Sequence, residues 1–165
     1  MRFDTSGARI LIVDDQEIHT RLLRTILTLD GFTNVMTCND PREAVNVFKR
    51  FSPDIVLLDL MMFPYDGFTV MRNIQQELGD SDEVPIVFLT ADVNPEHRRR
   101  ALSLGAKDFL AKPFDHEEVV LRIRNLLETR YLYLRLKELA EGVGSLFVEG
   151  SDVAERAVEE LGSTL

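Results

Sequence analysis

Short apolar runs alternate with segments of helical periodicity along the 165 residues of this chain. The runs have the length and the β-branched or apolar character of strands, and they lie at 9–13, 32–38, 55–58, 85–89 and 108–110. Each is followed by a segment whose apolar residues recur at the spacing of one helix face, as at Ile18, Leu22 and Ile26. Because strands that alternate with helices join through right-handed crossovers, the pattern predicts an α/β fold with one parallel sheet covered on both faces.

The number of strand–helix units narrows the topology. Five units predict a five-stranded parallel sheet, doubly wound in the (βα)5 flavodoxin-like order. The last helical segment is longer than a sheet needs, running from Asp115 to about Glu141. We expect Gly142-Val143-Gly144 to break this extended C-terminal helix, and a short amphipathic segment to follow.

Polar side chains follow four of the predicted strands at the point where each strand ends. Asp14 and Asp15 follow the first strand, Asp59 the third, Thr90 the fourth, and Lys112 the fifth. The carboxyl ends of parallel strands form one edge of the sheet, where ligands of such folds bind. We therefore expect these side chains to converge in one pocket that suits a hard cation and a phosphoryl group.

The chemistry of this set can be worked out from the residue types. Clustered carboxylates raise one another's pKa unless a cation offsets them, and Mg²⁺ prefers such oxygen ligands. No cysteine or histidine adjoins these positions in the sequence, which disfavours zinc. A carboxylate such as Asp59 can attack phosphorus and form an acyl phosphate. Lys112 would then neutralise the phosphoryl oxygens, and Thr90 would donate a hydrogen bond to one of them.

Over about residues 7–128 the sequence resembles the receiver domain of two-component response regulators (CheY-like). The resemblance rests on Ile-Leu-Ile-Val before Asp14-Asp15, Pro53-Asp-Ile-Val-Leu-Leu-Asp59, Asp66-Gly67, Phe-Leu before Thr90-Ala91, and Phe109-Leu-Ala-Lys112-Pro113-Phe114. It implies that Asp59 is the residue modified by phosphorylation. It also implies that Asp14, Asp15, Asp59 and the backbone carbonyl of Met61 bind Mg²⁺, while Thr90 and Lys112 hold the phosphoryl group. Thr90 and Phe109 would form the switch, and the Lys112–Pro113 peptide is expected to be cis.

The resemblance also implies a function. The chain would take a phosphoryl group from a sensor histidine kinase or phosphotransfer protein, and it would be a catalyst only of its own phosphorylation and dephosphorylation. The surface formed by the fourth helix, fifth strand and fifth helix would change and control a partner or an output domain. One departure from the family pattern is Phe63-Pro64, where proline is expected one position earlier. We therefore expect an altered path for that loop.

We expect two parts, a receiver domain at 1–128 and a helical extension and tail at 129–165. The extension is either a dimerisation or partner-binding element, or a linker to an output domain outside this chain. Its sequence resembles linkers that precede cyclic-dinucleotide phosphodiesterases and diguanylate cyclases. A homodimer is expected through the last helix or through the face of the fourth helix, fifth strand and fifth helix.

Composition excludes several classes of protein. The formal net charge of −9 argues against a nucleic-acid-binding surface, and no helix-turn-helix pattern follows Gly144, so direct DNA binding is not expected. No apolar run reaches the roughly 20 residues needed to span a bilayer. The start of the chain is too short and too polar for a signal peptide, and one cysteine allows no internal disulfide. These features indicate a cytoplasmic protein.

Three further features have mainly structural interpretations. Cys38 is expected to be a small hydrophobe at a strand end. His19, His97 and His116 lack the spacing of metal ligands and are expected to be solvated helix residues. The run Arg98-Arg99-Arg100 predicts either a solvated face or a surface for a partner or a second copy.

Two other functions fit parts of the pattern. Haloacid-dehalogenase-like phosphatases also use Mg²⁺ and an aspartyl phosphate, but their nucleophile lies in an Asp-x-Asp pair after the first strand. The pair here, Asp14-Asp15, has no spacer. A flavodoxin needs a Ser/Thr/Gly-rich loop at that place to bind phosphate, and Asp14-Asp15-Gln16-Glu17 would repel it.

Overall fold

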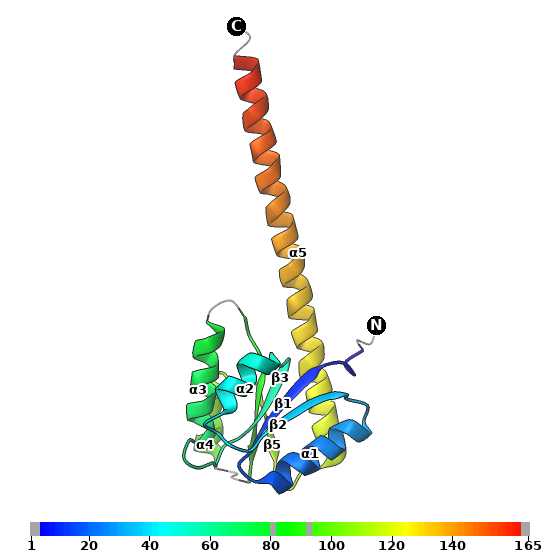
Figure 1. Cartoon of the computed structure of the whole chain (residues 1–165), viewed down its shortest axis with the longest axis vertical. Helices are drawn as coiled ribbons and strands as arrows, with labels where there is room; N and C mark the ends of the chain where they lie inside the picture. Colours follow the sequence, from blue (N-terminus) through cyan, green and yellow to red (C-terminus); the bar gives the residue numbers. More distant parts are fainter. Residues whose placement is uncertain (1–3, 80–81, 92–93, 163–165) are drawn as a thin grey trace. The chain divides into compact units, whose positions relative to one another are not determined.

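The structure is a computed structural model that describes residues 4–79, 82–91 and 94–162, without the side chains of 143–162. Strands and helices alternate through the described residues, as the sequence predicts (Figure 1). In chain order they are β1 Arg9–Val13, α1 Glu17–Leu29, β2 Asn34–Cys38, α2 Ala44–Phe51, β3 Ile55–Asp59, α3 Gly67–Leu78, β4 Ile86–Thr90, α4 Pro95–Ser103, β5 Asp108–Ala111 and α5 His116–Gly162.

The strands form one parallel five-stranded sheet in the order β2-β1-β3-β4-β5. This is the doubly wound flavodoxin-like order, so the predicted fold class is confirmed. The order in which strands are added to the sheet changes direction next to β1. Strand β2 lies on one side of β1, and β3, β4 and β5 follow on the other side. In the register of these strands Val13 pairs with Leu58, Asp59 with Leu89 and Thr90 with Ala111. The carboxyl ends of four strands are thereby aligned at one edge.

The central strands are buried on both faces, which explains their unbroken apolar sequences. Successive side chains of a strand point to opposite faces of the sheet. Leu11, Leu58 and Phe88 belong to a core cluster that includes residues of α2, α3 and α4. Figure 1 shows α2 and α3 on one side of the sheet, and α1 with the first part of α5 on the other. The two layers of helices leave the carboxyl edge of the sheet as the place where polar side chains gather.

A glycine fixes the start of α3 directly behind β3. The side chain of Asp66 caps the helix by accepting a hydrogen bond from the backbone N–H of Thr69 at 2.8 Å. A Cβ atom on Gly67 would lie 2.4 Å from the backbone oxygen of Asp59 and 2.9 Å from the ring of Phe88. Glycine is therefore required here by the close approach of α3 to β3, rather than by a turn.

The last helix is longer than the sequence predicts. The capping residues Asn94 of α4 and Asp115 of α5 accept hydrogen bonds from the backbone N–H groups of Glu96 and Glu118. The predicted break at Gly142-Val143-Gly144 is wrong, because α5 continues from His116 to Gly162 and includes the segment expected to be a separate helix. A glycine inside a helix costs only about 1 kcal/mol relative to alanine, which strong helix formers on either side can offset.

The chain divides into two compact units, Met1–Arg130 and Tyr131–Leu165. Near the end of the first unit the buried side chain of Arg130 donates to Asp82 Oδ1 at 2.5 Å and to the backbone oxygen of Glu83 at 2.6 Å. The functional division predicted after residue 128 stays a prediction. Within the described ranges, no helix is both long enough and apolar enough to cross a bilayer.

Candidate functional site

Three carboxylates meet at the carboxyl edge of the sheet. Asp14 and Asp15 follow β1, and Asp59 closes the neighbouring strand β3. Each offers an oxygen that lies within 4.8 Å of the others. Asp14 and Asp59 are buried, and Asp15 is half-buried. The sheet order therefore brings together side chains that are up to 45 positions apart in the sequence.

The ammonium group of Lys112 lies among these carboxylates. Its Nζ donates to Asp14 Oδ2 at 2.8 Å and to Asp59 Oδ1 at 3.0 Å. Its backbone N–H donates to the carbonyl oxygen of Thr90 at 2.9 Å, which fixes the residue beside the end of β4. The convergence expected from the sequence is thus seen for the three carboxylates and the lysine.

His19 also belongs to this cluster, so its prediction as a solvated helix residue is wrong. Its Nδ1 lies 3.0 Å from Asp14 Oδ2 and 3.0 Å from Lys112 Nζ, and its side chain is 25% exposed. The ring meets Phe114 edge-on at 6.1 Å between centroids. His19 lies in the first turn of α1, and a helix that directly follows β1 begins at the carboxyl edge. The position of His19 in this first turn was the sequence signal from which its place in the cluster could have been predicted. His116, by contrast, is exposed at the start of α5.

Thr90 and Phe109 lie on neighbouring strands beside the cluster. Thr90 is the last residue of β4 and is 6% exposed. Phe109 on β5 is 7% exposed, and its ring lies 6.1 Å from that of Phe88. The phenyl ring is therefore held inside the fold in this structure.

The arginine run of α4 covers aromatic rings, a role that the sequence analysis missed. The guanidinium carbon of Arg98 lies 5.2 Å from the centroid of Phe109, and that of Arg100 lies 4.4 Å from the centroid of Phe68. Phe68, Phe88 and Phe109 form a row, since the first two rings are 5.5 Å apart. Each end of the row is capped by a cation, a favourable electrostatic arrangement.

The electrostatics of the cluster favour a bound cation. Burial raises the pKa of Asp59, and the charge of Asp14 adds to this, while Lys112 and the backbone N–H of Met61 act in the opposite direction. Asp15 Oδ2 accepts from the backbone N–H of Phe63 at 3.2 Å, but its buried Oδ1 finds no hydrogen-bond partner among the described residues. Buried acceptors are normally paired. An all-oxygen set with an unpaired, buried carboxylate oxygen fits Mg²⁺.

The two loops that close the site contain cis peptides. Lys112–Pro113 is cis, as expected, and Phe63–Pro64 is cis as well. Phe63 is 84% exposed, so the position where the sequence departs from the family pattern presents its ring to solvent.

Cys38 is buried and behaves as the sequence predicts. Its Sγ lies 3.1 Å from the backbone oxygen of Asp40. Burial raises the pKa of this thiol, which keeps it protonated. Cys38 therefore contributes to packing.

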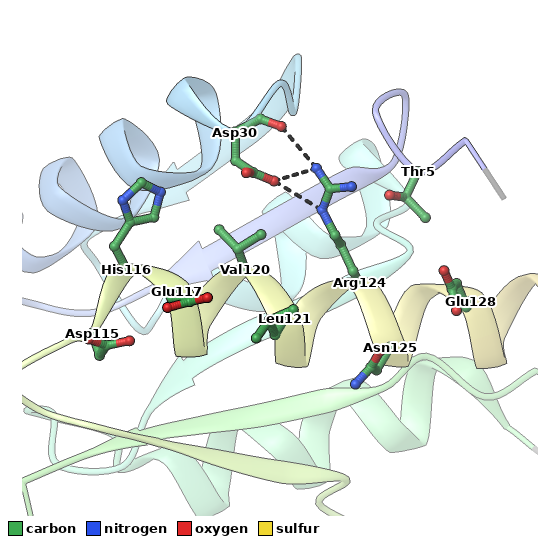
Figure 2. A pocket seen from close by; sticks show the side chains of 10 residues that line it. All are labelled: Thr5, Asp30, Asp115, His116, Glu117, Val120, Leu121, Arg124, Asn125 and Glu128. Carbon is green, nitrogen blue, oxygen red and sulfur yellow. Dashed lines mark hydrogen bonds and ion pairs between the residues drawn. The ribbon is translucent and has the colours of Figure 1, made fainter. Parts of the chain in front are cut away.

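A groove of about 740 Å³ lies along the first part of α5 and shares no residue with the cluster (Figure 2). The guanidinium of Arg124 spans it, donating from Nε to Asp30 Oδ2 at 3.0 Å and from Nη2 to the backbone oxygen of Asp30 at 3.1 Å. The charge of Arg124 in this groove is thus already paired with Asp30.

The chain is similar to proteins that share this architecture. The family model of the response regulator receiver domain matches residues 10–124. A probable transcriptional regulator, ycf27, of Porphyridium aerugineum is 41% identical over 119 residues, which make up 72% of this chain and 48% of that protein. The transcriptional regulatory protein TrcR of Mycobacterium tuberculosis is 35% identical over 151 residues, 91% of this chain and 57% of that protein. This chain therefore spans about half the length of these curated relatives.

A solved structure agrees with the sequence comparisons. The chemotaxis protein CheY4 of Vibrio cholerae superposes with a TM-score of 0.68 and 26% identity, and the match covers 73% of this chain and 98% of that one.

Proposed function

Since the chain belongs to the family of response regulator receiver domains, we propose that it accepts a phosphoryl group on Asp59 from a histidine kinase or a phosphotransfer protein. The observation that carries the proposal is the cluster at the carboxyl edge. There Lys112 Nζ lies within 3.0 Å of carboxylate oxygens of both Asp14 and Asp59. Three carboxylates and one ammonium group suit the binding of a cation and of a phosphoryl group together.

In the proposed reaction a carboxylate oxygen of Asp59 attacks the phosphorus of a phosphohistidine. A phosphorus–oxygen bond forms, the phosphorus–nitrogen bond breaks, and the leaving imidazole keeps the electron pair and takes up a proton. Lys112 stabilises the phosphoryl oxygens once its contact with the free carboxylate is lost, and Thr90 donates from its hydroxyl.

Asp14, Asp15, Asp59 and the backbone carbonyl of Met61 are the groups that would hold Mg²⁺. When bound, the ion supplies positive charge that offsets the carboxylates and the phosphoryl oxygens. The unpaired oxygen of Asp15 supports this assignment.

The proposed switch connects the site to a surface. Thr90 turns toward the phosphoryl group, Phe109 adjusts to the space beside it, and the face of α4, β5 and α5 changes. The row Phe68–Phe88–Phe109, capped by Arg98 and Arg100, supplies a contact between this switch and α4.

We further propose that residues 1–128 form the receiver and 129–165 a helical extension, and that the protein works in the cytoplasm. The output would lie in a partner or in a domain outside these residues, with no direct DNA contact by the residues of the receiver. The names of these two curated relatives favour transcriptional control as the output, over the cyclic-dinucleotide enzymes whose preceding linkers the extension resembles.

Intact-mass analysis after incubation with acetyl phosphate and Mg²⁺ tests the proposal. We expect one phosphoryl adduct on the parent chain, which disappears in Asp59→Asn and when the metal is removed with EDTA. The matched control is Asp54→Asn, because Asp54 lies just before the other end of the same strand and should leave the adduct unchanged. Absence of an adduct on a folded parent chain, or its persistence in Asp59→Asn, would overturn the assignment.

A further inference from the structure

Two of the three carboxylates at the carboxyl edge are held by direct contacts inside the cluster. Asp14 Oδ1 accepts from the backbone N–H of Gln16 at 2.9 Å. Its Oδ2 lies 2.8 Å from Lys112 Nζ and 3.0 Å from His19 Nδ1. Asp59 Oδ1 accepts from the same ammonium group at 3.0 Å. The orientation of both carboxylates is therefore fixed by neighbours within the cluster.

The third carboxylate, Asp15, depends on the loop between β3 and α3. Among the described residues its side chain has one hydrogen bond, in which Oδ2 accepts from the backbone N–H of Phe63 at 3.2 Å. Its other oxygen, Oδ1, is buried and has no partner within the same part of the chain. A carboxylate rotates readily about its last side-chain bond. The N–H of Phe63 opposes this rotation and leaves Oδ1 as the oxygen available to a cation.

The loop that carries this N–H is held at both ends. The backbone N–H of Gly67 donates to the carbonyl oxygen of Leu60 at 2.9 Å, which closes the loop at its base. Leu60 is buried directly after β3, and the side chain of Asp66 caps α3. The ring of Phe63 is 84% exposed. The main chain of the loop, rather than packing of this ring, therefore sets where the N–H lies.

We propose that the backbone N–H of Phe63 is a positioning group for Asp15 and sets the affinity of the site for Mg²⁺. The inference rests on the proposed function, in which Asp15 is a ligand of the ion. Hydrogen bonds to ligating carboxylates orient them, and loss of such a partner lowers metal affinity by about 10–100-fold. Proline, which the family pattern places at this position, has no N–H to donate. Because proline stands at Pro64 instead, position 63 keeps the N–H that the contact needs.

Replacing this single N–H by oxygen tests the inference. Exchanging Phe63 for phenyllactic acid, its α-hydroxy analogue, turns the amide into an ester and keeps the ring. Titration calorimetry of the full chain with Mg²⁺ should then give a dissociation constant raised roughly tenfold or more. The matched control is the same exchange at Tyr65, whose N–H donates no hydrogen bond within the described ranges. Its dissociation constant should equal that of the parent chain.

The outcomes separate this inference from the proposed function. Equal affinities of the Phe63 analogue and the parent chain, or an equal loss in the Tyr65 analogue, would overturn the inference. The proposed phosphorylation of Asp59 would still stand, because the parent chain would bind the ion. A parent chain that binds no Mg²⁺ would overturn the inference together with the assignment of Asp15 as a ligand.

Thermal unfolding of encoded variants distinguishes positioning from a purely structural role. Phe63→Pro removes the N–H, whereas Phe63→Leu keeps it. The readout is the rise in Tm on adding Mg²⁺, because a bound ion stabilises the folded chain by an amount that grows with its affinity. A hydrogen bond that served only the fold would change Tm equally with and without the ion.

We expect this rise in Tm to persist in Phe63→Leu and to shrink in Phe63→Pro. Loss of the rise in both variants would assign the effect to the ring and overturn the inference. An undiminished rise in Phe63→Pro would overturn it as well, because the N–H would then have no influence on the bound ion.

Discussion

Nζ of Lys112 lies 3.0 Å from Nδ1 of His19, so the ammonium group of Lys112 has three polar atoms within hydrogen-bond distance. The other two are oxygens of Asp14 and Asp59. An ammonium group has three N–H bonds, and these three atoms satisfy all of them when Nδ1 of His19 carries the lone pair. In that tautomer His19 is a positioning residue for the lysine.

We predict that His19→Leu slows phosphorylation of Asp59 while His19→Gln largely preserves it. Leucine leaves one N–H of the partly buried Lys112 unpaired, which costs about 1 kcal/mol. Such a cost corresponds to roughly a fivefold change in rate. The measurement is the time course of the phosphoryl adduct with acetyl phosphate and Mg²⁺. Equal rates for Leu and Gln would show that the contact does not position Lys112.

We predict that Asp59→Asn stabilises the fold at neutral pH in the absence of a divalent cation. The pKa of Asp59 is raised in the folded state, so its ionisation opposes folding when the pH lies above that pKa. As the pH falls through the raised pKa, the carboxyl group of Asp59 in the parent chain becomes neutral. The stability advantage of Asp59→Asn then disappears.

Thermal unfolding in EDTA from neutral to acid pH measures this difference. Each kcal/mol corresponds to about 2–4 °C in Tm for a chain of this size. A variant less stable than the parent chain at neutral pH would contradict the prediction, and so would a gain that grows on acidification.

We predict that Gly67→Ala destabilises the fold and lowers the yield of the Asp59 adduct. The added methyl group would overlap the backbone of Asp59 and the ring of Phe88. Overpacking of this kind costs about 1–3 kcal/mol. Urea unfolding gives the cost. The matched control is Gly142→Ala, where no described atom lies within 4 Å of the added carbon, and it should stabilise the helix by about 1 kcal/mol. A neutral Gly67→Ala would show that α3 can move away from β3.

We predict that Arg98→Gln loosens the ring of Phe109, whereas Arg99→Gln does not. The guanidinium of Arg98 contributes about 0.5–1 kcal/mol over the ring face at an exposed site. Among the described residues, Arg99 makes no such ring contact. The NMR signals of Phe109 in the unphosphorylated chain should shift and broaden in Arg98→Gln alone. Identical spectra for the two variants would show that Arg98 takes no part in the switch.

Much of the fold could be predicted because its signals are local. The apolar runs such as Ile55–Leu58 and the capping residues Asn94 and Asp115 each act within a few residues. The carboxyl-edge cluster could be predicted because parallel strands end at one edge, which is a property of the topology rather than of any side chain.

What escaped prediction depends on contacts between distant elements. The place of His19 in the site depends on its contact with Lys112, 93 positions away, and the role of Arg98 depends on its contact with the ring of Phe109 on β5. The need for Gly67 comes from the distance between α3 and β3. The break predicted at Gly142 failed for another reason, because a local signal was given more weight than the helix propensity of the residues around it.

Arg130 has a practical consequence for building chimeric regulators. Its buried guanidinium ties α5 to Asp82 and Glu83, ahead of β4. A foreign output module joined at Tyr131 or later would leave this anchor intact, and the donor sequence could be exchanged without disturbing the sheet. A junction placed before Arg130 would remove its hydrogen bonds to Asp82 and Glu83, so that end of α5 would be held less firmly against the fold.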